Sequence, residues 1–110
     1  MAQDLRHVVS DAPRVMVVDG SKLVRKLIGD TLLQELPGTQ VIGCANIAEA
    51  RAILAAGAVD LVTTALVLPD GDGLALARSV REAQGQAYVP VIVVSGNAQE
   101  MLETRAFTED

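Results

Sequence analysis

The most constraining stretch of the sequence is 59–73, VDLVTTALVLPDGDG, in which a short β-type run passes directly into a turn. Residues 61–66 are apolar or β-branched, and residues 69–73 have the composition of a turn followed by a helix start. Open parallel α/β sheets bind their ligands at such carboxyl ends of strands. The residue that ends this strand is Ala65, whose methyl group can neither accept a phosphoryl group nor bind a metal. The stretch therefore predicts the architecture of a site without its chemistry.

Strand-like and helix-like segments alternate along the rest of the chain. Apolar β-type runs cover 14–19, 40–44, 61–66 and 90–95, and helical patterns cover 21–36, 46–57, 74–83 and 97–107. Asn46 followed by Glu49 has the spacing of a capping box and predicts the start of the second helix. Because parallel crossovers are right-handed, this order predicts a doubly wound α/β fold with helices on both faces of a parallel sheet. We divide the chain into an N-terminal arm, 1–13, and a single domain, 14–110.

Composition limits the kind of core and the kind of partner. Half of the 110 residues are apolar, yet only Tyr88 and Phe107 are aromatic. The core must therefore consist of Val, Leu, Ile and Ala, as in buried parallel strands covered by helices. The formal net charge is −5 without any basic block, which argues against nucleic-acid binding through this segment.

Isolated reactive residues give little chemistry. Cys44 and His7 are the only residues of their types, so neither a disulfide nor a zinc cluster is expected. No apolar run approaches the length of a membrane span, and the first twelve residues do not resemble a signal peptide. We expect no membrane association and a cytoplasmic location.

Three strand ends are expected to meet at one edge of the sheet. In a doubly wound sheet the first, third and fourth strands lie side by side, so Asp19, Ala65 and Ser95 should be neighbours. At this point the chain resembles the receiver domain of bacterial response regulators from about Arg14 onward. The segments VVDGS (17–21), LVLPDGDG (66–73) and VIVVSGNA (91–98) carry the resemblance, which implies a flavodoxin-like, three-layer fold.

The resemblance also implies what this chain has lost. In the family, two acids after the first strand hold Mg²⁺, an Asp ending the third strand accepts the phosphoryl group, and a Ser or Thr ends the fourth strand. Here the corresponding residues are Asp19, Gly20, Ala65 and Ser95. A single carboxylate is a weak anchor for Mg²⁺, so we expect weak or absent metal binding and no cofactor. Asp70 and Asp72 could join Asp19 in a metal site, but a turn and a helix cap explain them more simply.

The family sheet has the order 2-1-3-4-5. In the family, a lysine follows the fifth strand, and this lysine has no counterpart before Asp110. We therefore expect the order 2-1-3-4, with the fifth strand missing. Val91, Ile92, Val93 and Val94 would then form an apolar edge strand without a protecting charge. We expect a homodimer, or a contact with another receiver or output domain, that covers this strand or the helices around it.

Three functions compete. The leading hypothesis is a degenerate receiver domain, not an enzyme, that acts in two-component signalling through protein contacts and regulates an attached or partner output domain. A second hypothesis is a working phosphoacceptor domain in which Ala65 replaces the acceptor, although Gly20 is a second loss. A third is a small-molecule binder, although no glycine-rich nucleotide motif is present.

Overall fold

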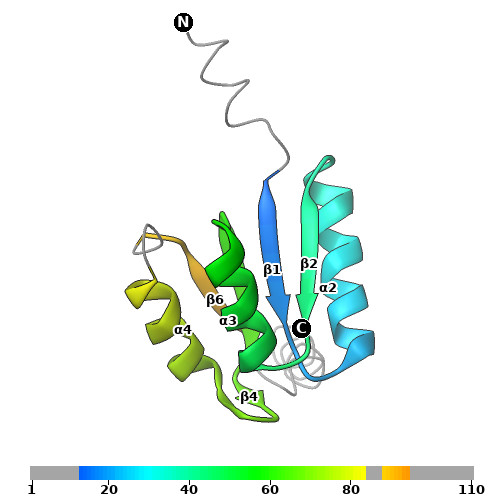
Figure 1. Ribbon diagram of the computed structural model, residues 1–110. Coiled ribbons are helices and arrows are strands. Elements are labelled where there is room, and N and C mark those ends of the chain that lie inside the picture. The colour runs from blue at the N-terminus through cyan, green and yellow to red at the C-terminus, as the bar shows by residue number, and fades with distance from the viewer. Residues whose placement is uncertain (1–12, 84–87, 95–110) are drawn as a thin grey trace, which may run out of the picture.

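The computed structural model describes residues 13–83 and 88–94 (Figure 1). The elements in chain order are β1 (Arg14–Val18), α2 (Lys22–Glu35), β2 (Gln40–Cys44), α3 (Ile47–Ala56), β3 (Leu61–Ala65), β4 (Val67–Leu68), β5 (Gly71–Asp72), α4 (Gly73–Glu82) and β6 (Val91–Val94). The expected arm at 1–12 and the expected last helix at 97–107 lie outside the described residues.

The main sheet is parallel and has the order β2-β1-β3-β6. Since β6 is the fourth strand of this sheet along the chain, the predicted order 2-1-3-4 is confirmed. The register pairs Val17 of β1 with Gly43 of β2 and with Thr63 of β3, which in turn pairs with Ile92 of β6. The central strands β1 and β3 are buried, as predicted from their unbroken apolar sequence.

Helices flank the sheet. One layer consists of α3, which contacts β1 and β2, and α4, which contacts β3 and β6; both are seen in front of the sheet in Figure 1. The helix α2, which precedes these two in the chain, also contacts β1 and β2. A side chain on Gly29 of α2 would meet Val41, and Gly43 lies under the side chain of Arg25, so α2 packs on the sheet face that carries Val41 and Gly43.

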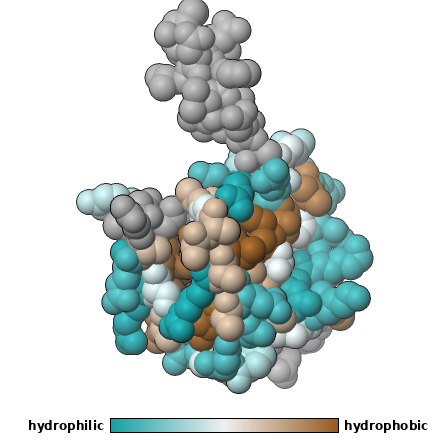
Figure 2. Space-filling model, viewed as in Figure 1, coloured by the Kyte–Doolittle hydropathy of each residue, from teal (hydrophilic) through white to brown (hydrophobic). Residues whose placement is uncertain are grey.

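The main core lies between the sheet and the α3/α4 layer. It includes Met16 and Val18 from β1, Val62 from β3 and Leu76 and Val80 from α4, all at most 1% exposed. In the space-filling view, brown hydrophobic atoms show through the middle of this face and hydrophilic residues surround them (Figure 2). The core is aliphatic, as the composition requires.

Polar side chains cap the helix starts. Ser21 caps α2 by accepting from the Val24 amide at 3.2 Å, and Asn46 caps α3 by accepting from the Glu49 amide at 2.8 Å. The Glu49 carboxylate reaches back to the Ala45 amide at 2.8 Å, which completes a capping-box arrangement. The sequence pattern at Asn46 and Glu49 therefore predicts this helix start correctly.

In the parts of the chain that the structure describes, none of the helices combines the length and the apolar composition needed to cross a membrane.

Candidate functional site

The carboxyl ends of β1, β3 and β6 lie at one edge of the sheet. Val18 pairs with Thr64, and Ala65 pairs with Val94. Asp19, which follows β1, therefore lies level with Ala65, which ends the neighbouring strand β3. The expected neighbour Ser95 lies outside the described residues. The loops from β1 to α2 and from β3 to α4 line this edge.

Asp19 is buried, with 7% of its surface exposed, and its polar groups are largely engaged in local structure. Its amide donates to the carbonyl of Cys44 at 3.0 Å, and its Oδ1 accepts from the Ser21 amide at 2.8 Å. Its carbonyl accepts from Nη1 of Arg25 at 2.6 Å. Asp19 thus fixes the turn that leads from β1 into α2.

Gly20 is exposed and follows Asp19 in that turn. A Cβ atom built on Gly20 would lie 3.4 Å from Cγ and Cδ of Pro69 and 3.9 Å from the carbonyl oxygen of Ala45. These are ordinary van der Waals distances, so the fold has room for a Cβ atom here. Packing around the Cβ position therefore does not require glycine at position 20.

Ala65 is 2% exposed and ends β3. The two threonines before it offer no obvious replacement nucleophile. Thr64 is buried and donates its hydroxyl to the carbonyl of Ala65 at 2.9 Å. The hydroxyl of Thr63 is buried within the strand and has no hydrogen-bond partner among the described residues.

The loop after β3 is tied to two helices. Asp70 accepts from the amides of Ile47 at 2.8 Å and Ala48 at 3.1 Å, at the start of α3. Asp72 caps α4 by accepting from the Ala75 amide at 2.8 Å. The simpler reading of these two acids, as turn and cap residues, agrees with these contacts, although the sequence did not indicate that Asp70 serves a helix 23 residues earlier.

Two groups near this edge have shifted acidity. Hydrogen bonds from backbone amides, that of Ile47 first, lower the pKa of the Asp70 carboxyl. Burial raises the pKa of the Cys44 thiol to about 11; Glu49 adds to this and Arg25 opposes it. Because the thiolate is the reactive form of cysteine, Cys44 behaves as a small core residue.

A divalent metal would find a poor set of ligands at this edge. Mg²⁺ requires near-octahedral oxygen coordination and usually one or two carboxylates. Asp19 has one oxygen engaged by the Ser21 amide, and neither Gly20 nor Ala65 has a donor side chain. Within residues 13–83 and 88–94, no group of three or more His, Cys, Asp or Glu side chains is arranged to hold a metal.

Sequence reasoning missed two features of this edge. Arg25 bonds the carbonyl of Asp19 from α2, and its position six residues downstream gives no motif. The hairpin of β4 and β5 was also missed; it pairs Val67 with Asp72 and Leu68 with Gly71. The hairpin leaves Val67 72% exposed.

The strand predicted to form an apolar edge is β6. Among the described residues it pairs only with β3. Ile92 is 51% exposed and Val93 is 39% exposed, although both are large apolar side chains.

Comparison with protein families matches residues 15–110 to the response regulator receiver domain. Among curated proteins, the chain is similar to the sensor histidine kinase TmoS of Ectopseudomonas mendocina, with 30% identity over 106 residues, covering 96% of this chain and 11% of that protein. It is also similar to protein-glutamate methylesterase/protein-glutamine glutaminase 2 of Cereibacter sphaeroides, with 40% identity over 92 residues, covering 83% of this chain and 24% of that protein. The chain thus spans a quarter or less of the length of these relatives.

The fold is shared with solved receiver structures. The chemotaxis response regulator CheY4 of Vibrio cholerae superimposes with a TM-score of 0.68 at 23% identity, covering 86% of this chain and 79% of that chain. At this level of identity the likeness shows the fold alone. Together with the family match over 15–110, the strand order and the loops at the strand ends, it follows that the chain belongs to the response regulator receiver domain family of two-component signalling.

Proposed function

We propose that this receiver domain is degenerate: it does not accept a phosphoryl group at the usual position and acts through protein contacts. The observation that carries the proposal is the methyl side chain of Ala65 at the end of β3, level with Asp19. Phosphoryl acceptance needs an ionised carboxylate or another activated nucleophile aimed at phosphorus. Alanine supplies none.

The neighbouring side chains support the same conclusion. The hydroxyl of Thr64 is bonded to the backbone, and the carboxylates of Asp70 and Asp72 hold the starts of α3 and α4. Moving any of them to the strand end would break a hydrogen bond that maintains the fold. We further propose that Mg²⁺ binding is weak or absent, since Asp19 is the one acid of the family's metal site that remains.

Protein contact is the remaining way for the domain to signal. We propose that it regulates an attached or partner output domain in the cytoplasm, without catalysis of its own. The relatives with similar segments include a histidine kinase and a methylesterase of much greater length. The exposed side chains of Ile92 and Val93 on β6 suit a contact with another chain, because an apolar edge strand readily pairs.

Thermal unfolding tests the loss of phosphoryl chemistry. The chain is melted with millimolar Mg²⁺, with and without beryllofluoride as a phosphoryl mimic. A ligand that binds only the folded state stabilises it by about 2.7 kcal/mol at a hundredfold excess over Kd, so binding is readily seen. We expect no shift for the natural chain.

The matched variant restores both acids, Gly20→Asp with Ala65→Asp. A Cβ at position 20 meets Pro69 only at ordinary contact distance. We expect the double variant to gain a shift that requires Mg²⁺ and beryllofluoride together. A shift of that kind in the natural chain would show a working acceptor site and refute the proposal.

A further inference from the structure

The helix α2 exposes apolar side chains that a helix packed on a sheet normally hides. Leu23 is 66% exposed and Leu27 is 54% exposed, and Gly29 is the only buried residue of this helix. An amphipathic surface helix has charged and polar residues on its outer face. The leucines of α2 are therefore left uncovered by the residues that the structure describes.

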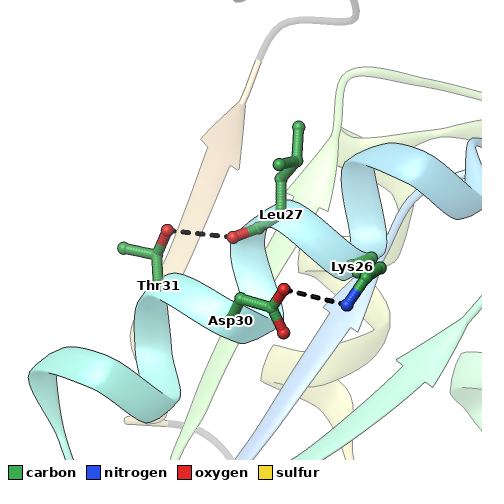
Figure 3. Close-up of polar contacts among 4 residues, drawn as sticks. All are labelled: Lys26, Leu27, Asp30 and Thr31. Atoms are coloured by element: carbon green, nitrogen blue, oxygen red, sulfur yellow. Dashed lines mark hydrogen bonds and ion pairs between the residues drawn. The ribbon is translucent and has the colours of Figure 1, made fainter.

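The geometry of the helix puts the two leucines on its outer side. Leu23 and Leu27 are four residues apart and so lie on the same face. Gly29, which faces Val41 of the sheet, is about 200° around the axis from Leu27 at 3.6 residues per turn. Figure 3 shows the side chain of Leu27 beside the ion pair of Lys26 and Asp30, which are joined at 3.0 Å.

The charges of α2 are divided between its two halves, and two of them, Lys26 and Asp30, flank the face of Leu23 and Leu27. Lys22 and Lys26 lie in the first half, whereas Asp30 and Glu35 lie in the second half, and all four are exposed. Two copies of α2 packed in parallel would bring like charges together. Two antiparallel copies would bring each basic half against an acidic half, which favours association and fixes its orientation.

We propose that a second copy of this chain covers the outer face of α2, in a two-fold dimer with antiparallel α2 helices. Lys26 lies opposite Asp30 of the second copy, so the two-fold axis passes close to Leu27, which forms the apolar centre, while Leu23 lies farther from the axis on the same face. A two-fold contact of this kind is self-complementary, because each partner offers the same surface. This inference rests on the proposed function as an interaction module and names one of its surfaces.

Mass measurement by light scattering and sedimentation tests the apolar centre. We expect a concentration-dependent dimer whose Kd rises at least roughly tenfold in Leu27→Glu, as when an anchor at the centre of an interface is removed. The matched control is Val67→Glu, since Val67 is 72% exposed on β4, and we expect it to leave the Kd unchanged. Circular dichroism checks that both variants remain folded, which their exposure favours.

Charge reversal tests the orientation. Lys26→Glu and Asp30→Lys each place like charges opposite each other in an antiparallel pair, so each variant alone should be monomeric where the natural chain is dimeric. Mixing the two variants should produce a heterodimer, seen by native mass spectrometry, because the carboxylate introduced in one chain would then face the ammonium group introduced in the other.

Three results would overturn the inference: a natural chain that stays monomeric at millimolar concentration, a Leu27→Glu dimer of unchanged Kd, or no heterodimer from the mixture. A dimer that survives Leu27→Glu but is lost in Ile92→Lys would place the contact at β6. In that case the proposed function would stand while the α2 interface would fail. The melting experiment with beryllofluoride tests the loss of phosphoryl acceptance independently of the α2 interface.

Discussion

Gly73 and Gly20 line the same edge of the sheet but differ in the space around them. A Cβ on Gly20 would lie at ordinary contact distance from Pro69, whereas a Cβ on Gly73 would collide with the backbone carbonyl oxygen of Ala65 and crowd Thr64. Gly73 also donates its amide to the carbonyl of Leu66 at 2.8 Å. The close approach of α4 to the end of β3 therefore requires glycine at position 73.

Gly73→Ala should reduce the free energy of unfolding by about 1–3 kcal/mol, the usual cost of an added group in a packed site. The loss is expected even though alanine is the better helix former. Gly43→Ala serves as the control, because its Cβ would lie 3.6 Å from Cδ of Arg25; it should change stability by less than about 0.5 kcal/mol. Urea unfolding measures both, and an unchanged Gly73→Ala variant would contradict the assigned contact.

Asp70 gives the fold a pH dependence in the acid range. Hydrogen bonds to its carboxylate, first from the Ile47 amide, lower its pKa in the folded state below the ordinary 3.8. A depressed pKa means that the stabilisation is present above the unfolded value and is lost as pH falls through the folded value. Asp70→Asn should thus be less stable than the natural chain at pH 7, and this difference should shrink below about pH 4.

Melting curves between about pH 3 and pH 7 for the two proteins measure this difference. A gap in melting temperature that stayed constant across that range would mean that ionised Asp70 does not hold the start of α3.

At the scale of elements, α4 follows the loop at the strand ends and packs one of its faces into the core. Leu76 and Val80 are fully buried, while Leu74 is 54% exposed. Leu76 and Val80 are four residues apart and share the inner face, whereas Leu74 is two residues before Leu76 and so lies about 200° away around the helix. Position on the helix, and not residue type, therefore decides the energetic role of each leucine.

Leu76→Ala should destabilise the domain by about 2–5 kcal/mol, through lost burial and the cavity left behind. Leu74→Ala on the same helix should change stability by less than about 0.5 kcal/mol. Chemical denaturation compares the two variants, and equal effects would be incompatible with the observed packing of α4.

Local sequence signals were sufficient for most elements. The unbroken apolar runs predicted β1 and β3, and Asn46 with Glu49 predicted the start of α3, because these signals act within one turn or strand. The contact of Asp70 with Ile47 and that of Arg25 with Asp19 could not be predicted, since they join segments brought together only by the fold. The hairpin of β4 and β5 was missed because each strand has only two residues, too few to show a period. The exposure of Leu23 and Leu27 was missed because their spacing resembles that of a buried face.

At the scale of the whole molecule, the two candidate contact surfaces lie toward opposite edges of the sheet. The helix α2 packs on β1 and β2, and β6 is at the other end of the strand order (Figure 1). If both surfaces bind further copies, assembly continues beyond two chains at high concentration, because each copy retains an uncovered surface.

Ile92→Lys should limit that assembly to dimers, since a lysine on an edge strand opposes pairing. Val67→Lys, an equally charged change at an exposed site outside β6, should leave the larger species in place. Sedimentation velocity over a range of concentrations measures the distribution of masses. Identical distributions for Ile92→Lys and the natural chain would exclude β6 as an assembly surface.

Two aspartates of the loop between β3 and α4 bind helix starts: Asp70 accepts from an amide at the start of α3, and Asp72 caps α4. These anchoring contacts are made by the chain itself and include neither a bound ion nor a covalent modification. A protein that recognises this side of the domain would meet one constant surface, and its occupancy would follow the cellular abundance of the two partners. Under the proposed function, the signal from such a domain depends on how much of it the cell contains, whereas the signal from a phosphorylated relative depends on its modification.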